Sequence, residues 1–145
     1  MKALLQRVTG ASVSVAGECV GAIDGGLLVL LGLDRGDDAA VADRLLDKLL
    51  AYRLFPDDQG RMNRSVADTG GGVLLVSQFT LSADTRKGLR PSFSSALPPA
   101  EAEPLYRHML GELRRRHPVV AAGVFGADMQ VALVNDGPVT FLLEL

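Results

Sequence analysis

The order of the predicted elements indicates an α+β fold: a curved, mostly antiparallel β-sheet or barrel with two main helices. Strand-like segments come first, followed by helix, strand, helix and strands again, which differs from the regular alternation of a doubly wound fold. The 145 residues fit one domain, 1–145. Apolar residues make up 48% of the chain, which favours a packed core over disorder.

The predicted sheet comes from short apolar segments, several of which are β-branched and bounded by glycine. The segments 27–33 and 73–80 begin with residues that are apolar on both alternations, which predicts strands covered on both faces. Gly17 marks a hairpin turn. The predicted strands are 3–8, 12–16, 19–23, 27–33, 73–80, 129–134 and 139–143.

Two segments carry the periodicity of amphipathic helices. The first, 39–54, has a broad apolar stripe, and Asp37 or Asp38 can cap its start. The second, 100–116, begins after a Pro-Pro pair. Pro104 must fall near the first turn of this helix, because a proline farther inside would kink it.

Charge and composition limit the classes of function. A formal net charge of −2 predicts no general nucleic-acid surface, so any RNA contact must be local. No apolar run reaches the ~20 residues that span a bilayer, and no signal peptide is evident, so we expect a cytoplasmic protein without membrane contact. Cys19 is the only cysteine, which excludes an internal disulfide. We expect Cys19 to be a packing residue.

The residues of several common active sites are missing. Cys19, His108 and His117 are too few and too scattered for a zinc site, so we expect no metal and no cofactor. Both histidines lie on or just after the second predicted helix, where we expect a solvated surface role. There is no P-loop, dinucleotide fingerprint or Gly-x-Ser-x-Gly elbow. A Ser-His-Asp hydrolase is therefore disfavoured.

A Gly-Pro pair interrupts the predicted strands near the C-terminus. Proline lacks the N–H that a central ladder needs, so it lies at an edge, at a bulge or at the first residue of a strand. A cis peptide bond would leave the Gly137 carbonyl free for a ligand, whereas an ordinary turn is the simpler interpretation. The segment is Asn135-Asp136-Gly137-Pro138-Val139-Thr140.

A second polar segment, 77–80, ends an apolar strand. The backbone N–H groups of Phe79 and Thr80 could converge there on the oxyanion of an acyl-transfer reaction. The alternative is a polar strand end with Phe79 inserted in the core. The segment reads Ser77-Gln78-Phe79-Thr80.

These two segments, together with 5–8 and the loop 83–93, resemble the D-aminoacyl-tRNA deacylase family over the whole chain. The resemblance implies hydrolysis of the ester between a D-amino acid and the 3′ terminus of tRNA. It also implies chiral proofreading that rejects L-aminoacyl-tRNA, cleavage of glycyl-tRNA, and a homodimer with active sites at the subunit interface. Ser82 and Leu89 depart from the family pattern, which puts loop contacts in doubt more than the chemistry.

The resemblance also implies roles for single residues. One group forms the catalytic wall around the terminal adenosine and the ester: Ser77, Gln78, Phe79 and Thr80. Gly137 and Pro138 match a Gly–cis-Pro dipeptide that enters the partner's pocket, and Arg7 matches a residue that braces it across the dimer. The remaining candidates bind substrate or RNA phosphate: Phe125, Met129 and Asn135, and Arg86 and Lys87.

Two other functions remain open from the residues themselves. One is a non-catalytic RNA-binding or dimeric scaffold domain, with Arg86 and Lys87 as phosphate contacts. The other is a general small-molecule esterase. Release of free D-amino acid from charged tRNA, without activity on simple aryl esters, separates all three.

Overall fold

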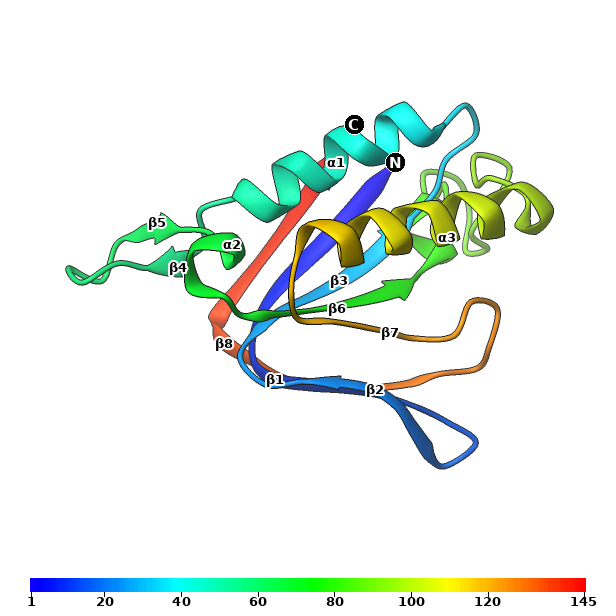
Figure 1. Cartoon of the computed structure of the whole chain (residues 1–145). Coiled ribbons are helices and arrows are strands. Elements are labelled where there is room, and N and C mark those ends of the chain that lie inside the picture. The colour runs from blue at the N-terminus through cyan, green and yellow to red at the C-terminus, as the bar shows by residue number, and fades with distance from the viewer.

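Helices lie on one face of a strongly curved six-stranded sheet in the computed structural model, which describes residues 1–145 (Figure 1). In chain order the elements are β1 (Lys2–Val15), β2 (Glu18–Ile23), β3 (Gly26–Gly32), α1 (Ala39–Ala51), β4 (Phe55–Pro56), β5 (Met62–Arg64), α2 (Val66–Thr69), β6 (Gly72–Ser77), the 3₁₀ helix η1 (Phe79–Ser82), α3 (Pro99–Arg116), β7 (Val120–Ala122) and β8 (Gln130–Glu144).

The sheet is mixed, which confirms the α+β prediction only in part. β1 runs antiparallel to β2, β3 and β8, whereas β6 runs parallel to both β3 and β7. The parallel pairs arise because α1 and α3 lie in the crossovers, which return the chain in the same direction. β2 and β7 approach so closely that a Cβ at Gly21 would lie 2.6 Å from the Ala122 carbonyl oxygen. The sheet is therefore nearly closed.

Two pairs of predicted strands are single long strands. The segments 3–8 and 12–16 belong to β1, apart from Ala16, and 129–134 and 139–143 belong to β8, apart from Met129. β1 and β8 pair from Lys2↔Glu144 to Ser14↔Gln130, with register shifts near Val8. The Gly-Pro pair is therefore an irregularity within β8 and not a turn between separate strands.

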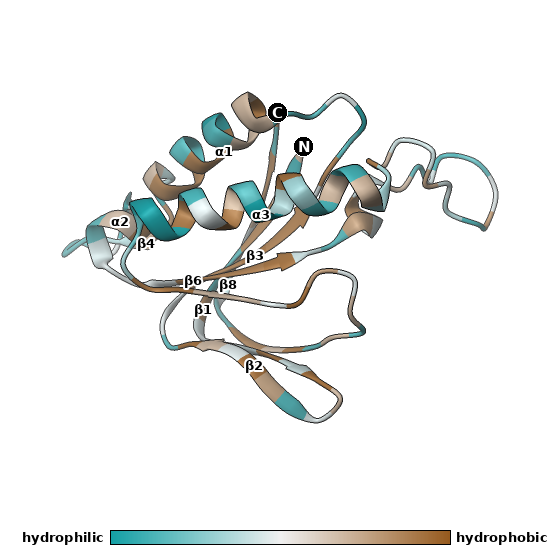
Figure 2. Ribbon diagram, turned by 45° about the vertical axis from the view of Figure 1, so that its right-hand side comes forward, coloured by the Kyte–Doolittle hydropathy of each residue, from teal (hydrophilic) through white to brown (hydrophobic).

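β3 and β6 separate two hydrophobic cores. Leu27 and Leu75 belong to a cluster of 21 buried residues that includes the inner sides of α1 and α3. Leu28 and Leu74 face the opposite side and join a second cluster of 7 buried residues inside the curl of the sheet. This confirms the prediction that both faces of these strands are covered, and Figure 2 shows both strands as hydrophobic ribbons beneath the helices.

The two main helices differ from the prediction only at their ends. The Asp38 carboxylate caps α1 by accepting the Val41 N–H at 2.9 Å, and the helix ends at Ala51. Pro104 is the sixth residue of α3 and so lies in its second turn, farther inside than expected.

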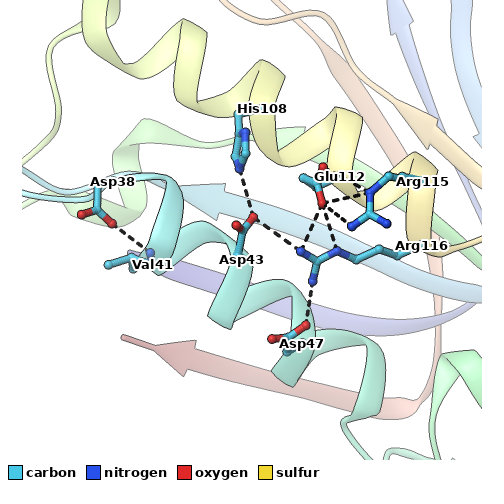
Figure 3. Close-up of polar contacts among 8 residues, drawn as sticks. All are labelled: Asp38, Val41, Asp43, Asp47, His108, Glu112, Arg115 and Arg116. Carbon is cyan, nitrogen blue, oxygen red and sulfur yellow. Dashed lines mark hydrogen bonds and ion pairs between the residues drawn. The ribbon is translucent and has the colours of Figure 1, made fainter.

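Polar side chains join α1 to α3 on their outer surface (Figure 3). Arg116 donates to Asp47 at 2.6 Å and to Glu112 at 3.2 Å, and His108 lies 3.0 Å from Asp43. Hydrogen bonds from Arg115 and Arg116 lower the pKa of Glu112 to about 2. These bonds fix the helix layer above the sheet and confirm a partly exposed, structural position for His108.

Two expectations about single residues are wrong. His117 is buried, and its Nε2 lies 2.6 Å from the Gly71 carbonyl oxygen, because the chain turns inward toward β7 directly after α3. Cys19 is exposed on β2, at the rim of the sheet, and does not pack in a core.

Candidate active site

The chain leaves the sheet abruptly after Ser77. The Gln78 N–H still donates to the Leu31 carbonyl at 2.7 Å, but the next residues form η1 instead of continuing the strand as predicted. Gly32 makes this turn possible, because a Cβ there would lie 2.9 Å from the Leu81 Cβ. The end of β6 is thus packed tightly against the end of β3.

A cavity of about 470 Å³ lies between this turn, α3 and the loop before α3. Ser77, Phe79 and Phe125 line the cavity, as predicted for pocket residues. Phe79 is 59% exposed, which excludes the alternative in which its ring fills the core. Its ring lies 5.1 Å from that of Phe93, so two aromatic rings flank the opening.

Tyr106 of α3 forms the inner wall of the cavity. Its hydroxyl donates to the Leu75 carbonyl at 3.2 Å, two residues before Ser77, and its ring lies 5.6 Å from that of Phe125. Burial raises the pKa of Tyr106 to about 12, so the side chain is a neutral hydrogen-bond donor. The helical periodicity predicts Tyr106 as an inward-facing residue but gives no sign of its contact with β6.

Gln78 and Thr80 turn away from the cavity and bond to each other. The Gln78 Nε2 donates to the Thr80 hydroxyl, and neither residue lines the cavity. The first N–H groups of η1, on Phe79 and Thr80, have no acceptor within the helix, and no side chain caps it. The backbone N–H groups of Phe79 and Thr80 are therefore available to a ligand at this position.

Asn135 holds the segment 135–140 in a fixed shape. Its side-chain oxygen Oδ1 accepts the Val139 N–H at 2.7 Å, and its side-chain nitrogen Nδ2 donates to the Thr140 hydroxyl at 2.9 Å. Gly137 has φ +145°, the Gly137–Pro138 peptide is cis, and both residues are exposed. Asn135 thus braces the segment, whereas the sequence suggested only a substrate contact.

Arg7 supports the same segment from β1. Its Nε donates to the Asp136 carbonyl at 2.9 Å, and its Nη1 donates to the Leu54 carbonyl at 2.8 Å. Within one chain, Arg7 therefore braces its own Gly-Pro dipeptide. The brace across a dimer that the resemblance implies stays a prediction.

The cavity and the Gly-Pro dipeptide lie at opposite ends of the sheet. Arg7, beside the dipeptide, pairs with Leu27 of β3, whereas Ser77 pairs with Leu31 of the same strand. Four residues of strand separate the two positions by about 13 Å, in addition to the strand spacings across the sheet. In Figure 1 the bend of β8 and the loop before α3 accordingly lie on opposite sides. One chain cannot bring the dipeptide to its own cavity.

Met129 and Arg86 have partners within the chain that the sequence did not indicate. Met129 packs against the core inside the curl, and its sulfur accepts the Val124 N–H at 3.4 Å, so it does not line this cavity. Arg86 is paired with Asp84 at 2.7 Å, which lowers the pKa of that carboxyl, whereas Lys87 is exposed without an ion pair.

Further residues that line the cavity come from separate parts of the chain. Arg35 belongs to no motif recognised in the sequence, Phe93 ends the segment 83–93 that carries the resemblance, and Tyr106 was expected only to face inward from its helix. No group of three or more His, Cys, Asp or Glu side chains is placed to hold a metal ion. None of the helices combines the length and apolar character needed to span a membrane.

Comparisons with known proteins extend over the whole chain. The family model described as "D-Tyr-tRNA(Tyr) deacylase" matches residues 4–144. A protein of Stutzerimonas stutzeri named D-aminoacyl-tRNA deacylase is 69% identical over 144 residues, 99% of each chain. A protein of Pseudomonas fluorescens with the same name is 63% identical over 144 residues, again 99% of each chain.

Solved structures agree with these matches. A structure named "c-Myc DNA Unwinding Element Binding Protein" superposes with a TM-score of 0.96 at 43% identity, over 100% of this chain and 99% of that one. A probable eukaryotic D-amino acid tRNA deacylase shares the fold with a TM-score of 0.88 at 16% identity, over 99% and 98% of the chains. The resemblance inferred from the two polar segments is confirmed, and this chain belongs to the D-Tyr-tRNA(Tyr) deacylase family.

Proposed function

We propose that this protein hydrolyses the ester bond between a D-amino acid and the 3′ end of tRNA, releasing free D-amino acid and tRNA. The observation that carries the proposal is the aromatic cavity beside Ser77 in a chain 69% identical, end to end, to a D-aminoacyl-tRNA deacylase. We assign the reaction to the cytoplasm, where charged tRNA is used, and assign no cofactor to it.

The cavity suits the terminal adenosine of tRNA. Its walls are mostly apolar, and the Phe79 and Phe93 rings at its opening offer faces on which a base can stack. Ser77 contributes the hydroxyl of a half-buried side chain beside these rings. In this arrangement the ester carbonyl reaches the start of η1.

We assign activation of the attacking water to the substrate. His108 lies beside Asp43 and His117 beside the Gly71 carbonyl, so neither histidine serves the cavity as a base. The vicinal 2′-hydroxyl of the terminal ribose takes this role, because a general base must be within hydrogen-bond reach of the proton. The backbone N–H groups of Phe79 and Thr80 then stabilise the oxyanion.

A test of this mechanism compares one change in the protein with one in the substrate. Thr80→Ala keeps the backbone N–H and should keep most activity. A 2′-deoxy terminal adenosine should cost about 10²-fold or more, a typical acid–base contribution. Single-turnover hydrolysis measures both. Loss of cleavage in Thr80→Ala with normal cleavage of the deoxy substrate would identify Thr80 as the chemical group instead.

Chiral selection is proposed to come from a second copy of the chain. Gly137 and Pro138 are exposed and too far from their own cavity, so in a homodimer they can enter the partner's cavity. Backbone at that position would clash with an L side chain and leave room for a D side chain, which is selection by exclusion. Glycine has no side chain to exclude, so glycyl-tRNA should also be cleaved.

The decisive assay for the function uses one tRNA charged in different ways. Purified protein should release D-tyrosine and glycine from tRNA and leave L-alanyl-tRNA intact. Binding of charged tRNA without cleavage would favour an RNA-binding scaffold, and hydrolysis of simple aryl esters would favour a general esterase. Equal resistance of glycyl- and L-alanyl-tRNA would contradict selection by steric exclusion.

A further inference from the structure

Arg35 is the only charged residue that lines the cavity. It lies just beyond β3, at the side of the cavity formed by the loop before α3. Its backbone N–H donates to the Ser95 carbonyl at 2.9 Å, and its Nε donates to the Ser94 carbonyl at 2.7 Å. The guanidinium is therefore oriented through one nitrogen, while its two terminal amino groups have no acceptor in the protein.

No carboxylate neutralises Arg35, in contrast to its cationic neighbours. Lys2 is paired with Asp34 at 2.9 Å, and Arg86 with Asp84 at 2.7 Å. Arg35 takes part in none of the ion pairs of the chain. An oriented, unpaired guanidinium at the edge of an otherwise uncharged cavity is suited to an anionic group on the ligand.

We propose that Arg35 binds the 5′-phosphate of the 3′-terminal nucleotide while the adenosine and its ester occupy the cavity. The inference rests on the proposed function, since it assigns a contact to the same substrate. Guanidinium matches phosphate with two parallel hydrogen bonds, and the free terminal amino groups provide such donors. Arg35 is thus a positioning residue, which fixes the ester relative to η1 by holding the nucleotide at its other end.

The test uses two small substrates that differ only in this phosphate. They are 2′(3′)-O-D-phenylalanyl-adenosine and the same ester of adenosine 5′-monophosphate. The wild-type protein should prefer the phosphorylated ester by roughly ten- to a hundredfold in kcat/KM, the usual range for a hydrogen-bonded charge. Arg35→Gln should bring this ratio close to one, and Arg35→Lys should restore part of it, because it keeps the charge without the planar fork.

Arg61→Gln is the matched control, because it removes an exposed arginine from the β4–β5 hairpin, away from the cavity. It should keep the wild-type ratio. A wild-type ratio near one, or a ratio that Arg35→Gln leaves unchanged, would overturn the inference. So would an equal loss on both esters, which would mean that the Arg35 side chain only holds the loop through its bond to the Ser94 carbonyl.

Full-length D-aminoacyl-tRNA allows a second measurement, which can be made even if the small esters react too slowly. The slope of log kcat/KM against log salt should be smaller by about 0.7 in Arg35→Gln, the contribution of one phosphate contact on single-stranded RNA. An unchanged slope would overturn the inference. Failure of the wild-type protein to release D-amino acid from tRNA would instead refute the proposed function itself.

Discussion

The segments 77–80 and 135–140 are both polar, but they are built in opposite ways: the first ends β6, whereas the second is an irregularity within β8. The first opens onto a cavity of about 470 Å³ and leaves backbone donors at the start of η1 unused within that helix. The second does not line this cavity, and the Asn135 and Arg7 side chains hold it through hydrogen bonds. One segment is suited to receive a ligand, and the other to present a fixed shape.

The two segments lie too far apart in one chain to form a single site. A rigid, exposed projection at one end of the sheet and a cavity at the other end cannot meet within a single copy. They can meet between two copies, since in a two-fold dimer residue i of one subunit can contact a different residue j of its partner, and the reciprocal contact then forms as well. We call 77–80 the receiving segment and 135–140 the presenting segment.

The largest effect is expected from Gly137→Ala in the presenting segment. Gly137 has φ +145°, and a Cβ there would lie 2.6 Å from the Val139 Cγ2 and 2.9 Å from the Val139 nitrogen. The segment must shift, and a displacement of about 1 Å near a reacting centre can cost 10²-fold. We expect a loss of that size in kcat/KM for D-aminoacyl-tRNA, measured by release of the D-amino acid.

Gly60→Ala is the control for backbone strain alone. Gly60 also has a positive φ, +78°, but a Cβ there meets nothing within 4 Å. It should lower thermal stability and leave kcat/KM close to the wild-type value. An equal loss of activity in both variants would show that general destabilisation, and not the shape of the segment, explains the effect of Gly137→Ala.

A smaller loss is expected from Asn135→Ala. The change removes the bonds to the Val139 N–H and the Thr140 hydroxyl, each worth about 1 kcal/mol, so kcat/KM should fall by up to about thirtyfold. Asn135→Asp keeps the acceptor for Val139 and loses the donor for Thr140, so its activity should be intermediate. If Asn135→Asp is as defective as the alanine variant, Asn135 acts through a contact other than this brace.

The smallest effect on activity is expected from Tyr106→Phe on the receiving side. Loss of the bond to the Leu75 carbonyl should lower the free energy of unfolding by about 1 kcal/mol, with the cavity retained. The pKa of Tyr106 is raised to about 12, so its contribution to stability is complete below pH 10 and is lost as the pH rises toward 12. The free energy of unfolding, measured with denaturant, should therefore fall more between pH 10 and 12 in the wild type than in Tyr106→Phe.

Much of the fold was accessible from the sequence because local patterns decide it. Apolar residues on both alternations predicted that β3 and β6 are covered on both faces, and the two cores confirm this. The parallel pairing of β6 was missed, because pairing depends on how the helical crossovers return the chain. The end of β6 was also missed, since it depends on the contact between Gly32 and Leu81.

The candidate site also contains residues that were predicted from the sequence and residues that were not. Ser77, Phe79 and Phe125 were predicted as pocket residues and line the cavity. Met129 was misplaced because an apolar residue next to a strand fits a core as well as a pocket. Arg35 could not be found, because the cavity that it lines and the Ser94 and Ser95 carbonyls that orient it come together only in the folded chain.

The most direct test of the account is activity in mixed dimers. Ser77→Phe places a ring in the cavity and leaves the segment 135–140 intact, whereas Gly137→Ala alters that segment and leaves the cavity intact. With a different tag on each chain, the heterodimer can be purified and assayed on D-aminoacyl-tRNA beside both homodimers.

In the heterodimer one unblocked cavity faces one unaltered Gly-Pro dipeptide. The account predicts about half of the wild-type activity in this species, because one of the two sites is complete, and little in either homodimer. The claim that the two segments act together across two copies would be contradicted by a purified heterodimer that is no more active than either homodimer. It would also be contradicted if the wild-type protein is fully active at a concentration at which sedimentation shows that it is a monomer.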